Sequence, residues 1–167
     1  MDLLTYSLLL IASFLGLSIG IILSNMAVEE ITRVSKYLKY LNIFLVPLII
    51  FMAVYSISIL YAIIFASIAL LLLIIFRNRY PYSLTYACMG ALMYISTLGK
   101  NSLDTAIIIS VYGLSIATIE ASRHFKNRLN GQIKSSENIS LMKKILSKYF
   151  YYLLVGIIFY VVFSIVI

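Results

Sequence analysis

Four polar side chains in this sequence have the types and spacing that could do chemistry. Glu29 and Glu30 are adjacent, and Glu120 and His124 are four residues apart, so the second pair lies on one face of any helix that contains it. Carboxylate and imidazole groups together can bind a divalent metal ion or act as an acid/base pair. A metal or acid/base site built from these four residues is therefore one hypothesis for a functional site, with the identity of any metal left open.

The same residues have an alternative interpretation that needs no special chemistry. Lysine and arginine residues are close to them in the sequence, and a histidine at the carboxyl end of a helix interacts favourably with the helix dipole. A helical projection at about 100° per residue places His124 among small residues, with Glu120 beside it, and directs Arg123 away. Projected from the first apolar segment, Glu29 and Glu30 leave its small-residue face, which favours a solvated position or a position among lipid headgroups for both.

The elements that must position these residues follow from the composition. Of 167 residues, 63% are hydrophobic and only 11% are charged, and the mean hydropathy is +1.05. A soluble domain of this length could not bury so much apolar surface, and soluble chains carry about a quarter charged residues. The composition excludes a soluble enzyme and a disordered chain, and it predicts an all-α integral membrane protein. In such a protein a net charge of +7 reflects topology, so we expect no nucleic-acid partner.

Six apolar segments are candidates for membrane spans. Crossing about 30 Å of hydrocarbon takes about 20 helical residues. The uncharged run 41–76 is too long for one span, so we divide it near residues 55–58, although no Gly, Pro or Asn marks a turn there. In a single domain, 1–167, the predicted spans are residues 3–25, 42–56, 58–76, 83–98, 103–119 and 145–167.

The basic residues give these spans an orientation, because cytoplasmic loops collect lysine and arginine. With both termini outside, the cytoplasmic segments are residues 26–41, 77–82 and 120–144. They contain most of the lysines and arginines, whereas Lys100 falls outside. We therefore predict a polytopic bundle of about six transmembrane helices in the cell membrane, with the N-terminus and C-terminus on the outer side. Its basic cytoplasmic face should attract anionic lipid headgroups.

Two features are expected at the cytoplasmic surface. Residues 26–41 carry Ile31, Val34 and Leu38 at helical spacing among charges, which is typical of an interfacial amphipathic helix or of an extension of the first span. Tyrosines at the predicted span boundaries are expected in the aromatic belt at headgroup level. These tyrosines are Tyr37, Tyr40, Tyr80, Tyr82, Tyr149, Tyr151 and Tyr152.

Small residues at three- and four-residue spacing predict where the spans pack, since the hydrophobic effect does not hold helices together in lipid. The expected helix-packing residues are Ala12, Gly16, Gly20 and Ser24 in the first span and Ser110, Gly113 and Ala117 in the fifth. We favour packing within one chain. The GxxxG pair of Gly16 and Gly20 would also suit a homodimer.

The sequence favours a non-catalytic role. No predicted span has a charged residue near its middle, which argues against a proton relay or a voltage sensor. The single cysteine, Cys88, permits no intrachain disulfide. We expect a subunit of a homo-oligomer or of a larger membrane assembly, with no cofactor. Two alternatives stay open: a small transporter or channel for a neutral or lipid-like solute, and a lipid-facing enzyme or metal site that uses Glu29, Glu30, Glu120 and His124.

Overall fold

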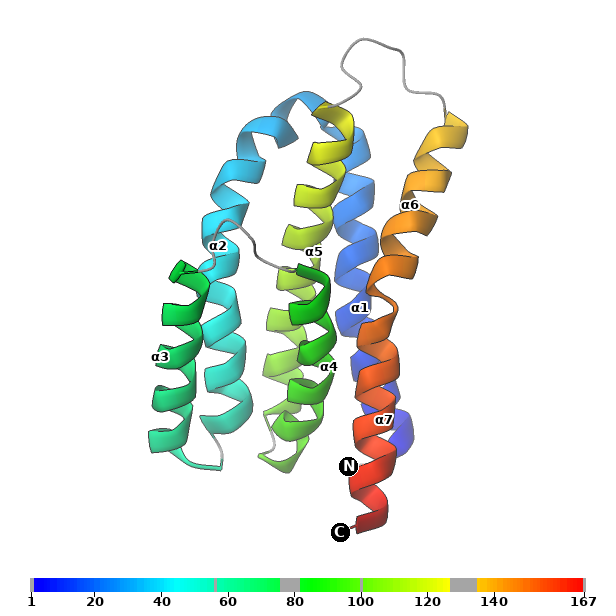
Figure 1. Cartoon of the computed structure of the whole chain (residues 1–167). Helices are drawn as coiled ribbons and strands as arrows, with labels where there is room; N and C mark the ends of the chain where they lie inside the picture. The colour runs from blue at the N-terminus through cyan, green and yellow to red at the C-terminus, as the bar shows by residue number, and fades with distance from the viewer. Residues whose placement is uncertain (1, 56, 76–81, 100, 127–134, 167) are drawn as a thin grey trace.

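The computed structural model describes residues 2–55, 57–75, 82–99, 101–126 and 135–166, and every element in these ranges is a helix (Figure 1). The predicted all-helical bundle is therefore confirmed for this part of the chain. The helices are α1 (Leu3–Met26), α2 (Val28–Tyr55), α3 (Ile59–Ile75), α4 (Tyr82–Leu98), α5 (Ser102–Lys126), α6 (Ser135–Tyr149) and α7 (Tyr151–Val166).

Several of these helices are suited to a membrane. By length and composition, four described stretches can cross one: Leu3–Met26, Arg33–Tyr55, Ser102–His124 and Ser140–Ser164. The helices α3 and α4 have 17 residues each, which at 1.5 Å per residue gives about 25 Å, slightly less than a typical hydrocarbon core. The described part of the chain thus has three long helices, α1, α2 and α5, of 24 to 28 residues, and four shorter ones of 15 to 17 residues.

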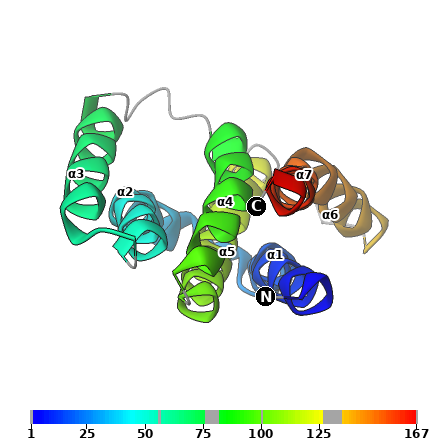
Figure 2. The same ribbon diagram turned by 90° about the horizontal axis from the view of Figure 1, so that it is seen from below.

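The helix α5 occupies the centre of the bundle. It packs against α1 and α2, α4 packs against α7, and α3 lies outside α2 (Figure 2). Because α5 has neighbours on several sides, its residues from Ser115 to Ile119 are all buried. The N-terminus and the C-terminus lie at the same end of the bundle (Figure 1), so the carboxyl end of α5 lies at the opposite end.

Glycine residues allow α1 and α5 to approach closely. A methyl group built on Gly16 would overlap the carbonyl group of Ser110, and one built on Gly20 would lie 2.5 Å from the carbonyl oxygen of Leu114 and 2.9 Å from the Cβ atom of Ala117. These neighbours are mainly backbone atoms, which cannot move aside as a flexible side chain can. The small residues of the two helices therefore meet inside one chain. In lipid, such close van der Waals contact takes the role that the hydrophobic effect has in soluble cores.

The other expected packing residues take different positions. Ser24 is buried and donates a hydrogen bond to the Gly20 carbonyl of its own helix. Gly113 faces Tyr86 of α4, whose hydroxyl oxygen would lie 2.9 Å from an added Cβ atom. Ala12 is exposed. A strict four-residue repeat drifts by about 40° per step around a helix with 3.6 residues per turn, so a stripe from Ala12 to Ser24 cannot stay on one face.

A second close crossing joins α4 and α7. A methyl group on Gly90 would lie 2.5 Å from the carbonyl oxygen of Tyr152 and 2.8 Å from the backbone nitrogen of Gly156. Neither glycine belongs to a GxxxG pair or to the expected packing residues. The contact brings two isolated glycines, 66 residues apart in the sequence, to one point, and this could not be recognised from local spacing.

The predicted segment 26–41 differs from the observed structure. Only Ala27 separates α1 from α2, and α2 continues unbroken from Val28 to Tyr55. The segment is therefore neither a separate interfacial helix nor an extension of the first span, but the beginning of the second long helix. No glycine or proline occurs between residue 28 and Pro47, so nothing in the local sequence ends the helix near residue 41.

Other boundaries also shift. The connection between α2 and α3 coincides with the division expected near residues 55–58, and α5 extends to Lys126, seven residues beyond the predicted span. The predicted last span, 145–167, begins inside α6, and Phe150 separates α6 from α7. Of the predicted cytoplasmic segments, residues 77–81 and 127–134 lie outside the described residues.

The contact between α1 and α5 gives a direct test. We expect Gly16→Ala to lower the free energy of unfolding by about 1–3 kcal/mol, the range for overpacking, because the added methyl group collides with backbone atoms of Ser110. Ala12→Val is the control, since Ala12 is exposed, and should change stability by less than about 0.5 kcal/mol. Unfolding in detergent micelles, followed by circular dichroism, measures both. Equal stability of the two variants would contradict this packing.

Candidate functional site

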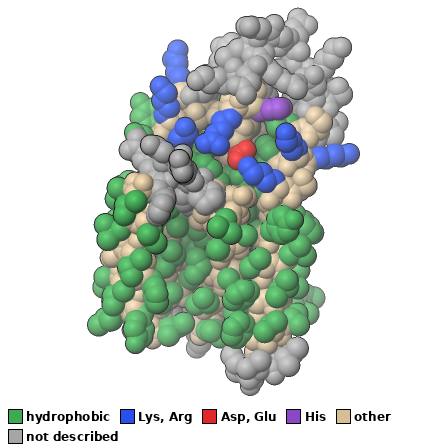
Figure 3. Space-filling model, viewed as in Figure 1, with side chains coloured by type: hydrophobic (Ala, Val, Ile, Leu, Met, Phe, Trp, Pro, Cys, Tyr) green, Lys and Arg blue, Asp and Glu red, His purple; other side chains and the backbone are tan. Residues whose placement is uncertain are grey.

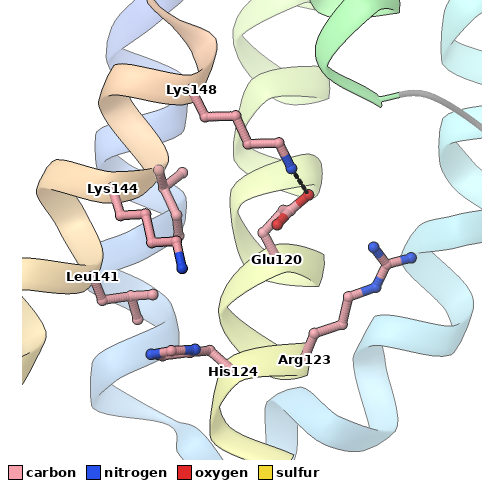
Figure 4. Close-up of a pocket in the computed structure, with 7 residues that line it drawn as sticks. Glu120, Arg123, His124, Leu141, Lys144 and Lys148 are labelled. Carbon is pink, nitrogen blue, oxygen red and sulfur yellow. Dashed lines mark hydrogen bonds and ion pairs between the residues drawn. The ribbon is translucent and has the colours of Figure 1, made fainter.

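A pocket lies between α5 and α6 near the end of the bundle opposite the termini (Figures 1 and 4). Its volume is about 200 Å³. Its charged and polar walls come from both helices, and its apolar wall comes from α6 alone. We name it the α5–α6 pocket. Its lining residues are Glu120, Arg123, His124, Leu141, Lys144, Ile145 and Lys148.

An ion pair closes one side of the α5–α6 pocket. The ammonium nitrogen of Lys148 lies 2.7 Å from the Oε1 atom of Glu120, and the hydroxyl of Tyr149 donates a hydrogen bond of 3.2 Å to the same oxygen (Figure 4). The Glu120 side chain is 19% exposed and that of Lys148 45%. Water therefore screens the attraction between Glu120 and Lys148 in part. The main effect of this ion pair is to hold α6 in register against α5.

The next turn of the two helices has a different composition. The helices run antiparallel (Figure 1), so four residues onward from Glu120 and four residues back from Lys148 place His124 opposite Lys144. Both side chains line the pocket and point into the space between the helices (Figure 4). Among the described residues, neither of these two side chains has a carboxylate partner.

Arg123 lies on another side of α5. Its guanidinium group is 5.5 Å from the ring centroid of Tyr82, the first residue of α4, and in the close-up it points away from His124 (Figure 4). The direction agrees with the helical projection, although Arg123 contacts an aromatic ring and also borders the pocket.

The four residues of the hypothesised polar cluster are not all brought together. Glu120 and His124 share the pocket, whereas Glu30 is exposed and does not line it. The side chain of Glu29 lies outside the described residues. Within the described part of the chain, no three His, Cys, Asp or Glu side chains come close enough to hold a metal ion. What the structure assembles here is one acid, one histidine and several cations.

The predicted position in the aromatic belt is wrong for two tyrosines. Tyr149 and Tyr152 are fully buried in the core, whereas Tyr37, Tyr40 and Tyr151 are exposed. Spacing relative to a span boundary does not reveal which side of a helix faces its neighbours. The side of α6 and α7 that carries Tyr149 and Tyr152 faces the bundle, because the close crossing of α4 and α7 turns it inward.

A cluster of tyrosines extends from the pocket into the core. The ring of Tyr86 is 5.6 Å from that of Tyr149 and 4.7 Å from that of Tyr152. The Tyr152 hydroxyl shares a hydrogen bond with Ser13, and the Tyr6 hydroxyl donates to the Gly156 carbonyl oxygen at 2.9 Å. Each hydroxyl thus has a partner on another helix, which is how phenol groups are accommodated in an apolar interior.

Comparisons with known proteins do not assign this arrangement. No protein-family model matches the chain, and neither curated proteins nor solved structures give a match.

A double-mutant cycle tests the ion pair. We expect Glu120→Gln and Lys148→Gln to show a coupling free energy of about 0.5–1 kcal/mol in low salt, because solvent reaches part of the pair, mainly on the Lys148 side. Added salt should reduce the coupling by screening. Lys143→Gln is the control, because Lys143 is exposed on α6 and does not line the pocket. Coupling of Glu120 to Lys143 as strong as to Lys148 would show only a diffuse charge effect.

Proposed function

We propose that the chain is a multi-pass protein of the cell membrane that crosses the bilayer six times. In this proposal α1, α2, α3, α4 and α5 are one crossing each, and α6 with α7 forms the last. The long apolar stretches support this proposal, as does the position of both termini at one end of the bundle, which an even number of crossings requires.

The charge distribution supports an orientation with both termini outside. Lysine and arginine side chains gather at one end of the molecule, above an apolar lower part (Figure 3). Cytoplasmic surfaces of membrane proteins carry such an excess, so we place this end in the cytoplasm, next to anionic headgroups. The described basic residues near this end are Arg33, Lys36 and Lys39 on α2, Arg123 on α5, and Lys143, Lys144 and Lys148 on α6.

Within the membrane, we assign the protein a non-catalytic role as a subunit of a larger assembly. One observation carries this choice: Glu120, the acidic residue of the candidate site, is engaged by Lys148 and Tyr149 and joins two helices. A carboxylate held in this way supports the packing of α6 and is not free to act as a base. The geometry therefore gives the lipid-facing enzyme no specific support.

The helix α3 supports the proposed assembly. The small residues of α1 that would suit a homodimer are used against α5 within the chain. In contrast, α3 packs mainly on α2, and most of its large apolar side chains are exposed. It is therefore the helix with most surface left for lipid or for a neighbouring subunit, which is either a second copy or another membrane protein.

A second candidate function, a transporter or channel for a neutral solute, is favoured by two polar side chains. Asn42 of α2 and Thr105 of α5 are buried, and in the described part of the chain the Asn42 amide and the Thr105 hydroxyl have no hydrogen-bond partner. Unsatisfied polar atoms are costly in an apolar interior, and a solute could supply the missing hydrogen bonds.

The orientation is tested by labelling single cysteines in intact cells. In a Cys88→Ser background, we expect a membrane-impermeant maleimide to label the D2C variant directly. The K143C variant should be labelled only after the membrane is permeabilised. Both positions are exposed, so access depends on the side of the membrane. The reverse labelling pattern would contradict the proposed topology. A tag at the C-terminus that can be reached only after permeabilisation, while D2C is labelled directly, would also contradict it, because the two termini would then lie on opposite sides.

Assembly is tested by native electrophoresis of the protein extracted gently from its own membranes. After allowance for bound detergent, we expect a species with a mass well above the 18.9 kDa of one chain. Cysteines placed at exposed positions of α3, such as Leu71, should form cross-links to the neighbouring subunit. A monomer that makes liposomes permeable to a small neutral solute such as glycerol would instead favour the transporter.

A further inference from the structure

Among the described residues, the turn of the α5–α6 pocket beyond the ion pair has a lysine and a histidine but no acid. One turn contains Glu120 and Lys148, an acid and a base that neutralise each other. The next turn contains His124 and Lys144, which face the same space (Figure 4). The antiparallel register that produces the first pair therefore also places a lysine opposite a histidine. A negative group between them would complete the second turn as Glu120 completes the first.

The surroundings of this turn match an anion with an apolar attachment. The pocket has a volume of about 200 Å³, and Leu141 and Ile145 form its α6 wall between the polar positions. Lysine and histidine offer N–H donors that suit phosphate oxygens, and charge-assisted bonds to an anion are stronger than neutral ones. Glu120 also lines the pocket, but its charge is already balanced by Lys148.

The position of the pocket along the bundle suggests the source of the anion. The apolar stretch of α5 that can cross a membrane ends at His124, and basic side chains cover the same end of the molecule (Figure 3). In the proposed orientation this level coincides with the phosphates of the cytoplasmic leaflet, where anionic lipids gather.

We propose that the α5–α6 pocket binds the phosphate group of an anionic lipid headgroup between Lys144 and His124. This inference depends on the proposed membrane insertion and deepens the expected attraction of anionic lipids by naming one site for it. A bound headgroup would join α5 to α6 next to the Glu120–Lys148 pair, so the lipid would stabilise the packing of α6 on the bundle.

Native mass spectrometry of the purified full-length protein in detergent, titrated with phosphatidylglycerol or with phosphatidylcholine, tests this site. We expect one phosphatidylglycerol to bind more tightly than phosphatidylcholine. Lys144→Gln should weaken that binding about tenfold, the effect of losing one charge-assisted contact. The matched control is Lys143→Gln, which removes the same charge from the adjacent exposed position outside the pocket and should change the affinity less than about twofold. Circular dichroism confirms that both variants fold.

Three results would overturn the inference. Equal weakening by Lys143→Gln and Lys144→Gln would mean that a diffuse basic surface attracts the lipid. If the unmodified protein bound phosphatidylglycerol no more tightly than phosphatidylcholine, the pocket would not be a site for an anionic headgroup. Competition by inorganic phosphate at millimolar concentration, without a lipid preference, would assign the pocket to a soluble phosphate compound. Because detergent micelles have no sidedness, these results are independent of the cysteine labelling, so a wrong topology and a wrong ligand are distinguishable.

Discussion

The close approach of α1 and α5 is the constraint on which the rest of this bundle depends. In a bilayer, lipid chains are as apolar as leucine side chains, so helices gain little by hiding hydrophobic surface from one another. They associate where backbones come close enough for dense van der Waals contact, and at Gly16 and Gly20 nothing larger than hydrogen fits against α5. This contact fixes the central helix, and α2 packs against it in turn.

The position of α5 determines the chemistry at its carboxyl end. Glu120 and His124 lie one turn apart near the level where the apolar stretch ends, and α6 descends beside them in the opposite direction (Figure 1). The partial burial of Glu120 requires a compensating charge, which Lys148 provides, and the Tyr149 hydroxyl occupies the same carboxylate oxygen. The register set by this pair places Lys144 and His124 together.

The crossing of α4 and α7 repeats the first constraint with different residues. Gly90 and Gly156 bring the two helices close, and tyrosines fill the space around them. Each buried phenol needs a hydrogen-bond partner, and carbonyl oxygens and the Ser13 hydroxyl on neighbouring helices supply these for Tyr6 and Tyr152. The tyrosine cluster therefore adds directional contacts between α1, α4 and α7, which apolar side chains alone would not provide.

The sequence by itself determined the all-helical class of the fold and most of its helical segments. Hydropathy and charge are sums over neighbouring residues, so the apolar runs, the division near residues 55–58 and the clustering of basic residues could be recognised without a structure. The small residues Gly16 and Gly20 also indicated a packing face, because their spacing is local. Helix ends were less predictable, since nothing in the sequence marks where α2 should begin relative to the predicted segment 26–41.

Only the tertiary structure decided which side chains meet. Glu120 pairs with Lys148, 28 residues away, and Gly90 meets Gly156, yet no periodicity relates these positions. The tyrosines at 149 and 152 were expected at the lipid surface but are buried, because rotation of a helix about its axis depends on its neighbours. The sequence carries the length and polarity of each helix, whereas register and rotation arise from contacts between helices. The candidate site consists of such contacts, so its residues could be named from the sequence but not brought together.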